Sequence, residues 1–247
     1  MQVPFEPPVT SNSAEAGVGV GVGGYVGQIE SVVGYISGAM SQRRRRHRRR
    51  ATGRAEPHRN FDPRRVGGLE CDAWIAYYRR EWIRFLRGAV GLTRHTFGLP
   101  WPATLHGAVL VLRANQLWAP FPDNDPDGAR RAMARFYRMV GRRYHEPFDP
   151  AHAAELEVAW WRVHRTHQHA EPGDDRRPLV DALAALYAYV YDVAEPDVRA
   201  AAEQRALAMD HSDRWVQEGC DPASPLIGQE RAALVRSYAA LLAAVHR

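Results

Sequence analysis

The sequence predicts an all-α fold, a single helical bundle of about seven helices that follows a disordered Gly- and Arg-rich N-terminal tail. From residue 66 onward, prolines occur in short clusters separated by about 15–25 proline-free residues. Proline lacks the N–H donor and clashes with the preceding turn, so the clusters indicate helix boundaries. Between them, apolar residues recur every three or four positions, which is the period of a helix face. No segment of residues 66–247 alternates apolar and polar residues over the length of a strand.

Three helices are predicted in the first half of this region, at residues 69–90, 102–118 and 128–143. Their apolar stripes include Trp74, Tyr78, Trp82 and Phe85 in the first, Val109, Leu110, Val111 and Leu112 in the second, and Met133, Phe136, Tyr137 and Val140 in the third. The second helix is apolar nearly all round, and we therefore expect it at the centre of the core.

Four further helices are predicted at residues 150–168, 178–194, 197–218 and 229–246. Their stripes include Leu156, Trp160 and Val163 in the first, Leu179, Leu183, Leu186 and Val190 in the second, Val198, Ala202, Met209 and Val216 in the third, and Leu234, Tyr238, Leu241 and Val245 in the fourth. Pro178 suits the first position of its helix, where a missing N–H donor does no harm. Seven amphipathic helices joined by short loops are typical of a helical bundle.

The positive charge of the chain is concentrated at its N-terminal end. All 33 basic residues other than histidine are arginine, and eleven of them, against five acids, lie in residues 1–65. The remaining 22 arginines and 23 acids leave residues 66–247 nearly neutral. We therefore divide the chain into a disordered basic tail at 1–65 and an all-helical globular domain at 66–247. The near-neutral charge of the domain argues against nucleic-acid binding by the domain itself.

Seven arginines of the tail form the first candidate binding site. They are Arg43, Arg44, Arg45, Arg46, Arg48, Arg49 and Arg50. Such a block repels itself and stays solvated, but it also suits a nucleic acid or another acidic surface, since each phosphate contact releases counterions. The preceding Gly-rich apolar stretch, residues 17–40, contains Gln28 and Glu30, so we do not expect a membrane partner. Translation from Met40 instead of Met1 would remove that stretch.

The helix predicted at 150–168 contains the second candidate site, a set of metal ligands. His164 and His167 lie about one turn apart in the sequence WWRVHRTHQH, and positions i and i+3 share a helix face, so one metal ion could contact both. Glu157 lies two turns before His164 on the same side. Bundles bind metals through carboxylates and histidines of facing helices. The alternative is a pair of histidines packed near the helix C-terminus, where positive charge is favoured.

Two other motifs are weaker candidates. The sequence from Asp123 to Gly128 matches the start of a calcium-binding loop, but Ala134 replaces the bidentate glutamate, so we interpret it as a turn in which Asp127 caps the next helix. The residues Asp210–Asp213 include Asp, His and Ser, but neighbouring helical residues do not face each other, so they form no catalytic triad. We expect them on a solvated helix surface.

An arginine stripe accompanies the helix predicted at 69–90. Arg80, Arg84 and Arg87 follow one another at helical spacing beside the aromatic face. Such a helix suits a membrane surface or a partner. The alternative is an ordinary core helix whose arginine stems cover apolar neighbours.

No motif assigns a reaction to this chain. The sequence holds no Walker, HExxH or GxSxG motif, and its two cysteines, Cys71 and Cys220, lie far apart, as in proteins of a reducing compartment. We therefore expect a soluble, cytoplasmic, non-catalytic interaction or accessory protein that binds another protein. The alternatives are a helical metalloprotein or oxidoreductase that uses His164 and His167, and a nucleic-acid-associated protein that acts through Arg43–Arg50.

Overall fold

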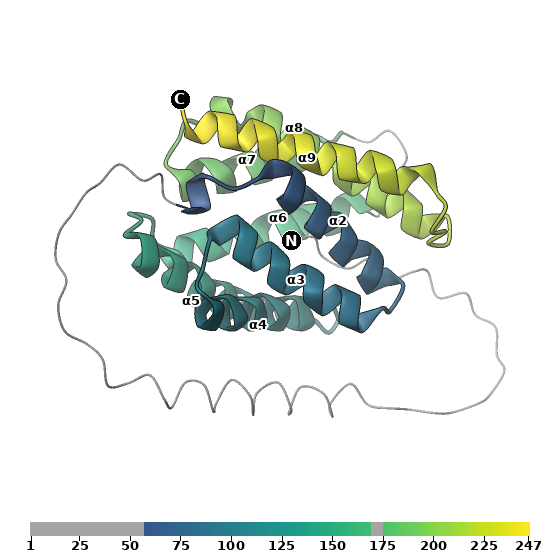
Figure 1. The fold of residues 1–247 in the computed structure, drawn as a ribbon, viewed down its shortest axis with the longest axis horizontal. Helices are drawn as coiled ribbons and strands as arrows, with labels where there is room; N and C mark the ends of the chain where they lie inside the picture. The colour runs from purple at the N-terminus through teal and green to yellow at the C-terminus, as the bar shows by residue number, and fades with distance from the viewer. Residues whose placement is uncertain (1–56, 169–174) are drawn as a thin grey trace. The chain divides into compact units, whose positions relative to one another are not determined.

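The computed structural model describes residues 57–168 and 175–247, and this part of the chain is entirely helical (Figure 1). The described residues form eight α-helices and one short 3-10 turn, without a strand. The elements are η1 (Pro57–Arg59), α2 (Pro63–Tyr78), α3 (Trp82–Phe97), α4 (Trp101–Trp118), α5 (Pro126–Tyr144), α6 (Pro150–Gln168), α7 (Arg177–Tyr191), α8 (Glu195–Gln217) and α9 (Pro225–Val245). The all-α prediction is confirmed, and the helices predicted from residue 102 onward correspond to α4–α9.

Prolines and polar caps determine where the helices begin. Proline occupies one of the first two positions of seven of the described helices, where its missing N–H donor has no intrahelical partner to lose. The side chains of Asp62, Asp125 and Ser224 accept hydrogen bonds from backbone N–H groups at the starts of α2, α5 and α9. The cap of α5 is therefore Asp125, and the prediction that Asp127 caps this helix is wrong.

The single helix predicted at 69–90 is two helices. The chain reverses between Tyr78 and Trp82, where Arg80 adopts a left-handed conformation with φ 58°. The Glu81 N–H donates to the Ala76 carbonyl across 2.8 Å and closes the turn. The Glu81 carboxylate accepts hydrogen bonds from Arg79 and Arg84 on either side. Neither glycine nor proline marks the reversal, which is why the apolar period alone predicted one helix across it.

The prediction that residues 102–118 form the centre of the core is also wrong. The corresponding helix, α4, packs against α3 and α5 and lies at one edge of the bundle (Figure 1). Leu110, Val111 and Trp118 are buried on its inner side, but Trp101 and Leu105 remain exposed. The apolar composition of α4 did not show which of its sides would be buried, because burial depends on how the other helices pack.

The largest hydrophobic cluster lies between α4, α5, α6 and α7, with contributions from α8 and α9. A smaller cluster joins α2, α8 and α9 around Trp215. Four tryptophans are fully buried, namely Trp118, Trp160, Trp161 and Trp215. The two that lie side by side in the sequence, Trp160 and Trp161, place α6 at the centre of the larger cluster. No described helix is both long and apolar enough to cross a membrane.

The fold begins before the predicted boundary at residue 66. The ring of His58 stacks on Tyr144, with centroids 4.3 Å apart, and its Nε2 donates to Glu146 Oε1 across 2.6 Å. Arg59 donates to both carboxylate oxygens of Glu146 and, across 2.9 Å, to the carbonyl of Tyr191. These contacts attach η1 to the C-terminal ends of α5 and α7, and the buried ring of Phe61 continues into the main core.

Candidate functional site

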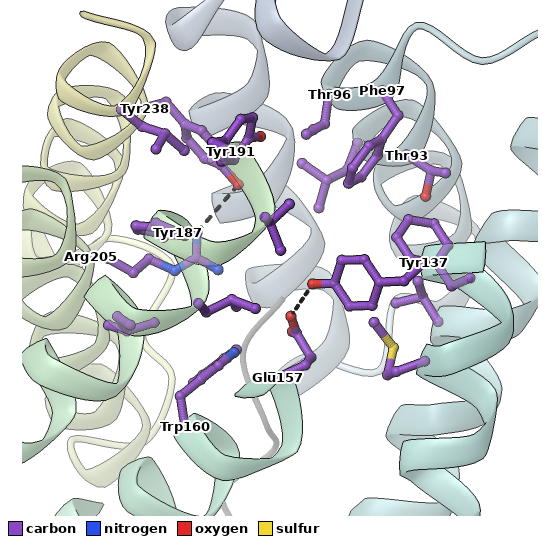
Figure 2. Close-up of a pocket in the computed structure, with 18 of the residues that line it drawn as sticks. Thr93, Thr96, Phe97, Tyr137, Glu157, Trp160, Tyr187, Tyr191, Arg205 and Tyr238 are labelled. Atoms are coloured by element: carbon purple, nitrogen blue, oxygen red, sulfur yellow. Dashed lines mark hydrogen bonds between the residues drawn. The ribbon is translucent and has the colours of Figure 1, made fainter. Parts of the chain in front are cut away.

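A cavity of about 130 Å³ lies inside the bundle (Figure 2). Side chains from every helix between α3 and α9 contribute to its wall. The wall is mostly apolar and rich in aromatic rings. The aromatic residues are Phe97, Phe136, Tyr137, Trp160, Trp161, Tyr187, Tyr191 and Tyr238. Bulky rings from five helices converge at this place without filling it.

Glu157 of α6 places a carboxylate in this wall. The hydroxyl of Tyr137 on α5 donates to Glu157 Oε2 across 2.6 Å (Figure 2), and the indole N–H of Trp161 donates to Oε1 across 3.2 Å. Burial and the neighbouring Glu157 carboxylate raise the pKa of Tyr137 well above its usual value. Tyr137 therefore stays protonated and acts as the donor, and both oxygens of Glu157 are engaged.

A buried ion pair lies on the other side of the cavity. Arg205 of α8 contacts Glu70 of α2 through two nitrogens, at 2.7 Å and 2.5 Å, and the Tyr238 hydroxyl of α9 donates to Glu70 across 2.6 Å. Burial opposes ionisation of Glu70, but the nearby Arg205 charge and these hydrogen bonds hold its pKa below the usual value. Arg205 also donates to the Tyr238 hydroxyl across 3.3 Å (Figure 2). The ion pair is thus neutral overall and joins three helices.

Between these two groups, Trp160 directs an unsatisfied donor into the cavity. Its side chain is 1% exposed, and its indole nitrogen has no hydrogen-bond partner. Figure 2 shows the indole nitrogen pointing toward the open centre, between Glu157 and Arg205. The buried Thr96 hydroxyl in the wall also lacks a partner, whereas Thr93 donates to the carbonyl of Ala89 in its own helix. Buried polar groups are normally paired, so an unpaired donor facing a cavity indicates a missing acceptor.

The three residues predicted to bind a metal have different hydrogen-bond partners in the structure. His164 is fully buried and contacts Asp213 Oδ2 through Nε2 at 3.0 Å, whereas His167 contacts Asp210 Oδ1 at 3.0 Å. Glu157 faces the cavity with the partners described above. Among the described residues, no group of three or more His, Cys, Asp and Glu side chains is arranged to hold a metal ion. The metal site at Glu157, His164 and His167 gains no support here and stays a prediction.

The residues Asp210–Asp213 do not form a solvated surface as a whole. Asp213 is buried and accepts hydrogen bonds from His164 and, across 2.8 Å, from Gln168. Ser212 is also buried. The prediction for this run is therefore wrong for its last two residues, because α8 packs one side of it against α6. The predicted nucleic-acid site at Arg43–Arg50 lies outside the described residues and stays a prediction.

Sequence reasoning identified Glu157 but missed its neighbours in the cavity wall. Arg205 offered a signal, since it lies on the apolar stripe of Val198, Ala202 and Met209 at helical spacing. A charged residue on a buried stripe requires a partner. Glu70 occupies a comparable position beside Cys71 on the inner side of α2. The identity of each partner depends on tertiary packing and had no local signature.

Comparison of the chain with protein-family models, with curated proteins and with solved structures finds no match.

Proposed function

We propose that this chain is a binding protein whose ligand is a small molecule held in the central cavity. The main observation in support of this proposal is the unpaired indole N–H of Trp160, which is buried and points into that cavity (Figure 2). Leaving a buried donor unsatisfied costs about 1–3 kcal/mol. A ligand that presents an acceptor to this N–H removes the cost on binding.

The size and lining of the cavity define the ligand class. A cavity of about 130 Å³ is close to the ~150 Å³ apolar cavity that takes up benzene in an engineered protein. The carboxylate of Glu157 already accepts two hydrogen bonds, and the charge of Arg205 is paired with Glu70, although Arg205 Nε has no hydrogen-bond partner. The ligand that fits is therefore a neutral, ring-sized, mainly apolar molecule with one oxygen acceptor, such as a cyclic ketone.

Several features of the wall support binding without covalent chemistry. Thr93 uses its hydroxyl within its own helix, and Tyr137 and Tyr238 donate to carboxylates. Burial raises the pKa of Tyr187 and Tyr191, which disfavours their use as bases at neutral pH. This arrangement favours the non-catalytic accessory role expected from the sequence and adds a ligand to it.

Two probes of equal shape test the proposal. Cyclohexanone and methylenecyclohexane differ only in the replacement of a carbonyl oxygen by a methylene group. Titration of the full chain, followed by calorimetry or amide NMR shifts, should show tighter binding of the ketone by about fivefold, the equivalent of one hydrogen bond of about 1 kcal/mol.

Trp160→Phe should abolish the preference for the ketone. Trp118→Phe is the matched control, because Trp118 is also buried with an unpaired indole nitrogen but does not line the cavity. Failure of wild-type protein to bind either probe would reject the proposal. Equal loss of the ketone preference in the Trp118 variant would show that Trp160 does not contact the ligand.

A further inference from the structure

Apolar side chains remain exposed along α3 and α4, outside the cavity and away from its proposed ligand. Ile83 is 69% exposed and Leu86 40% on α3, and Trp101 is 56% exposed and Leu105 37% on α4. The two helices pack against each other. Packing in the bundle buries the inner side of α4 and leaves apolar side chains on its outer side exposed to solvent.

The same two helices carry only positive formal charge. From Trp82 to Pro122 the sequence contains no Asp or Glu, although the chain has 28 acids. This stretch contains four arginines, at positions 84, 87, 94 and 113. The nearest acid before it, Glu81, is neutralised by Arg79 and Arg84. The exposed apolar side chains therefore lie on two helices whose Asp, Glu, Lys and Arg residues are all arginines.

Arg94 connects the charge with the aromatic ring. Its guanidinium lies 4.3 Å from the ring centroid of Trp101, and it donates to the Leu99 carbonyl across 3.0 Å. These contacts hold the C-terminal end of α3 against the start of α4 and keep the tryptophan on the outside. Arginine beside an exposed tryptophan is the combination that favours the interface between lipid headgroups and acyl chains.

We propose that this α3–α4 face (Ile83, Leu86, Trp101, Leu105 and the neighbouring arginines) docks on a bilayer that contains anionic phospholipids. Apolar side chains that alternate with arginines on surface helices suit the headgroup region, where the apolar groups enter the acyl boundary and the guanidinium groups contact phosphates. Charge complementarity thus selects an anionic membrane surface.

The test measures partitioning of the full chain onto vesicles of phosphatidylcholine with or without phosphatidylglycerol. Ile83→Glu and Trp101→Glu each place a carboxylate at a position that is more than half exposed, so folding is not expected to suffer. Each should lower the partition coefficient on the mixed vesicles by about tenfold, through the lost apolar contact and the added negative charge. Ala239→Glu is the control, because it adds the same charge at an exposed position of α9, on the opposite side of the described bundle (Figure 1).

The arginine-rich tail is present in all four proteins and cannot produce a difference between them. Equal binding of wild type, both face variants and the control would therefore show that the tail alone contacts the vesicles, or that this face serves a protein partner, and would overturn the proposal. Equal binding of wild type to vesicles with and without phosphatidylglycerol would overturn the requirement for anionic lipid. A lower partition coefficient in the two face variants alone would support the proposal.

Discussion

At the scale of single residues, the described part of the chain contains a carboxylate without a visible partner. Glu230 of α9 is 0% exposed, and neither of its oxygens has a hydrogen-bond partner. Burial, together with the negative charges of Glu70 and Asp213, raises the pKa of Glu230 well above its usual value. Arg231 and Arg205 act in the opposite direction without reversing the shift. Burial therefore favours the protonated form of Glu230 in the folded protein.

This protonation makes stability depend on pH in a defined direction. The unfolded chain releases the Glu230 proton above about pH 4.3, whereas the folded chain retains this proton to higher pH because its Glu230 pKa is raised. The contribution of Glu230 to stability is thus full below that pH and falls by up to about 1.4 kcal/mol per pH unit above it.

Glu230→Gln should remove this loss of stability at higher pH, because glutamine is neutral in the folded and the unfolded state. The variant should be more stable than wild type at pH 7 and equal to it near pH 4, as measured by urea unfolding at each pH. Glu203→Gln, at an exposed position of α8, is the control and should change little at either pH. A variant that is destabilised equally at both pH values would show that Glu230 has an unseen partner.

At the scale of elements, the ion pair between Glu70 and Arg205 joins α2 to α8, with Tyr238 adding α9. All three side chains are buried. Removing one charge from such a pair leaves the other uncompensated at low polarity, which costs about 3–5 kcal/mol. Replacing both by apolar residues avoids that cost.

Arg205→Met should therefore destabilise the protein by about 3–5 kcal/mol in urea unfolding. Adding Glu70→Leu to Arg205→Met should recover most of the loss, although each change removes polar contacts. The pair Arg236→Met and Gln204→Leu, which removes an exposed hydrogen bond between α9 and α8, is the comparison and should show no such recovery. If the double variant at Glu70 and Arg205 were no more stable than Arg205→Met alone, the ion pair would not be the coupling between these helices.

The helices were predictable to the extent that their boundaries carry local chemistry. Prolines at helix starts are visible in the sequence, and α4–α9 were located from them and from the apolar period. The reversal at Arg80 was not predictable, because it uses an arginine in a left-handed conformation where glycine would have marked the turn. The outer position of α4 was missed because composition does not say which neighbours a helix finds.

The candidate site, too, could be predicted only in part from the sequence. Glu157 was singled out because it lies two turns before His164 on the same side of the helix, whereas the structure pairs it with Tyr137 and Trp161. His164 instead contacts Asp213 from α8. Spacing along α6 indicated that these residues share a helix face. Their partners on α5 and α8 depend on how those helices pack against α6, and no sequence pattern within α6 encodes that packing.

At the scale of the whole molecule, the described bundle combines an inner cavity with an outer basic and apolar face. The cavity is built from helices α3–α9, and two of its lining residues, Trp160 and Arg205, each have a buried N–H without a hydrogen-bond partner. The outer face belongs to α3 and α4. These helices take part in both, since Phe97 and Val111 line the cavity from their inner sides. We therefore expect this protein to bind a small apolar molecule in its cavity and a lipid surface at its α3–α4 face.

A crystal structure of the full chain grown with cyclohexanone tests the proposed ligand site most directly. The ring should lie in the cavity, with its oxygen about 3 Å from the indole nitrogen of Trp160. Ordered water bonded to Trp160 with the ketone absent at saturating concentration, or a cavity closed by its own side chains, would contradict the proposal.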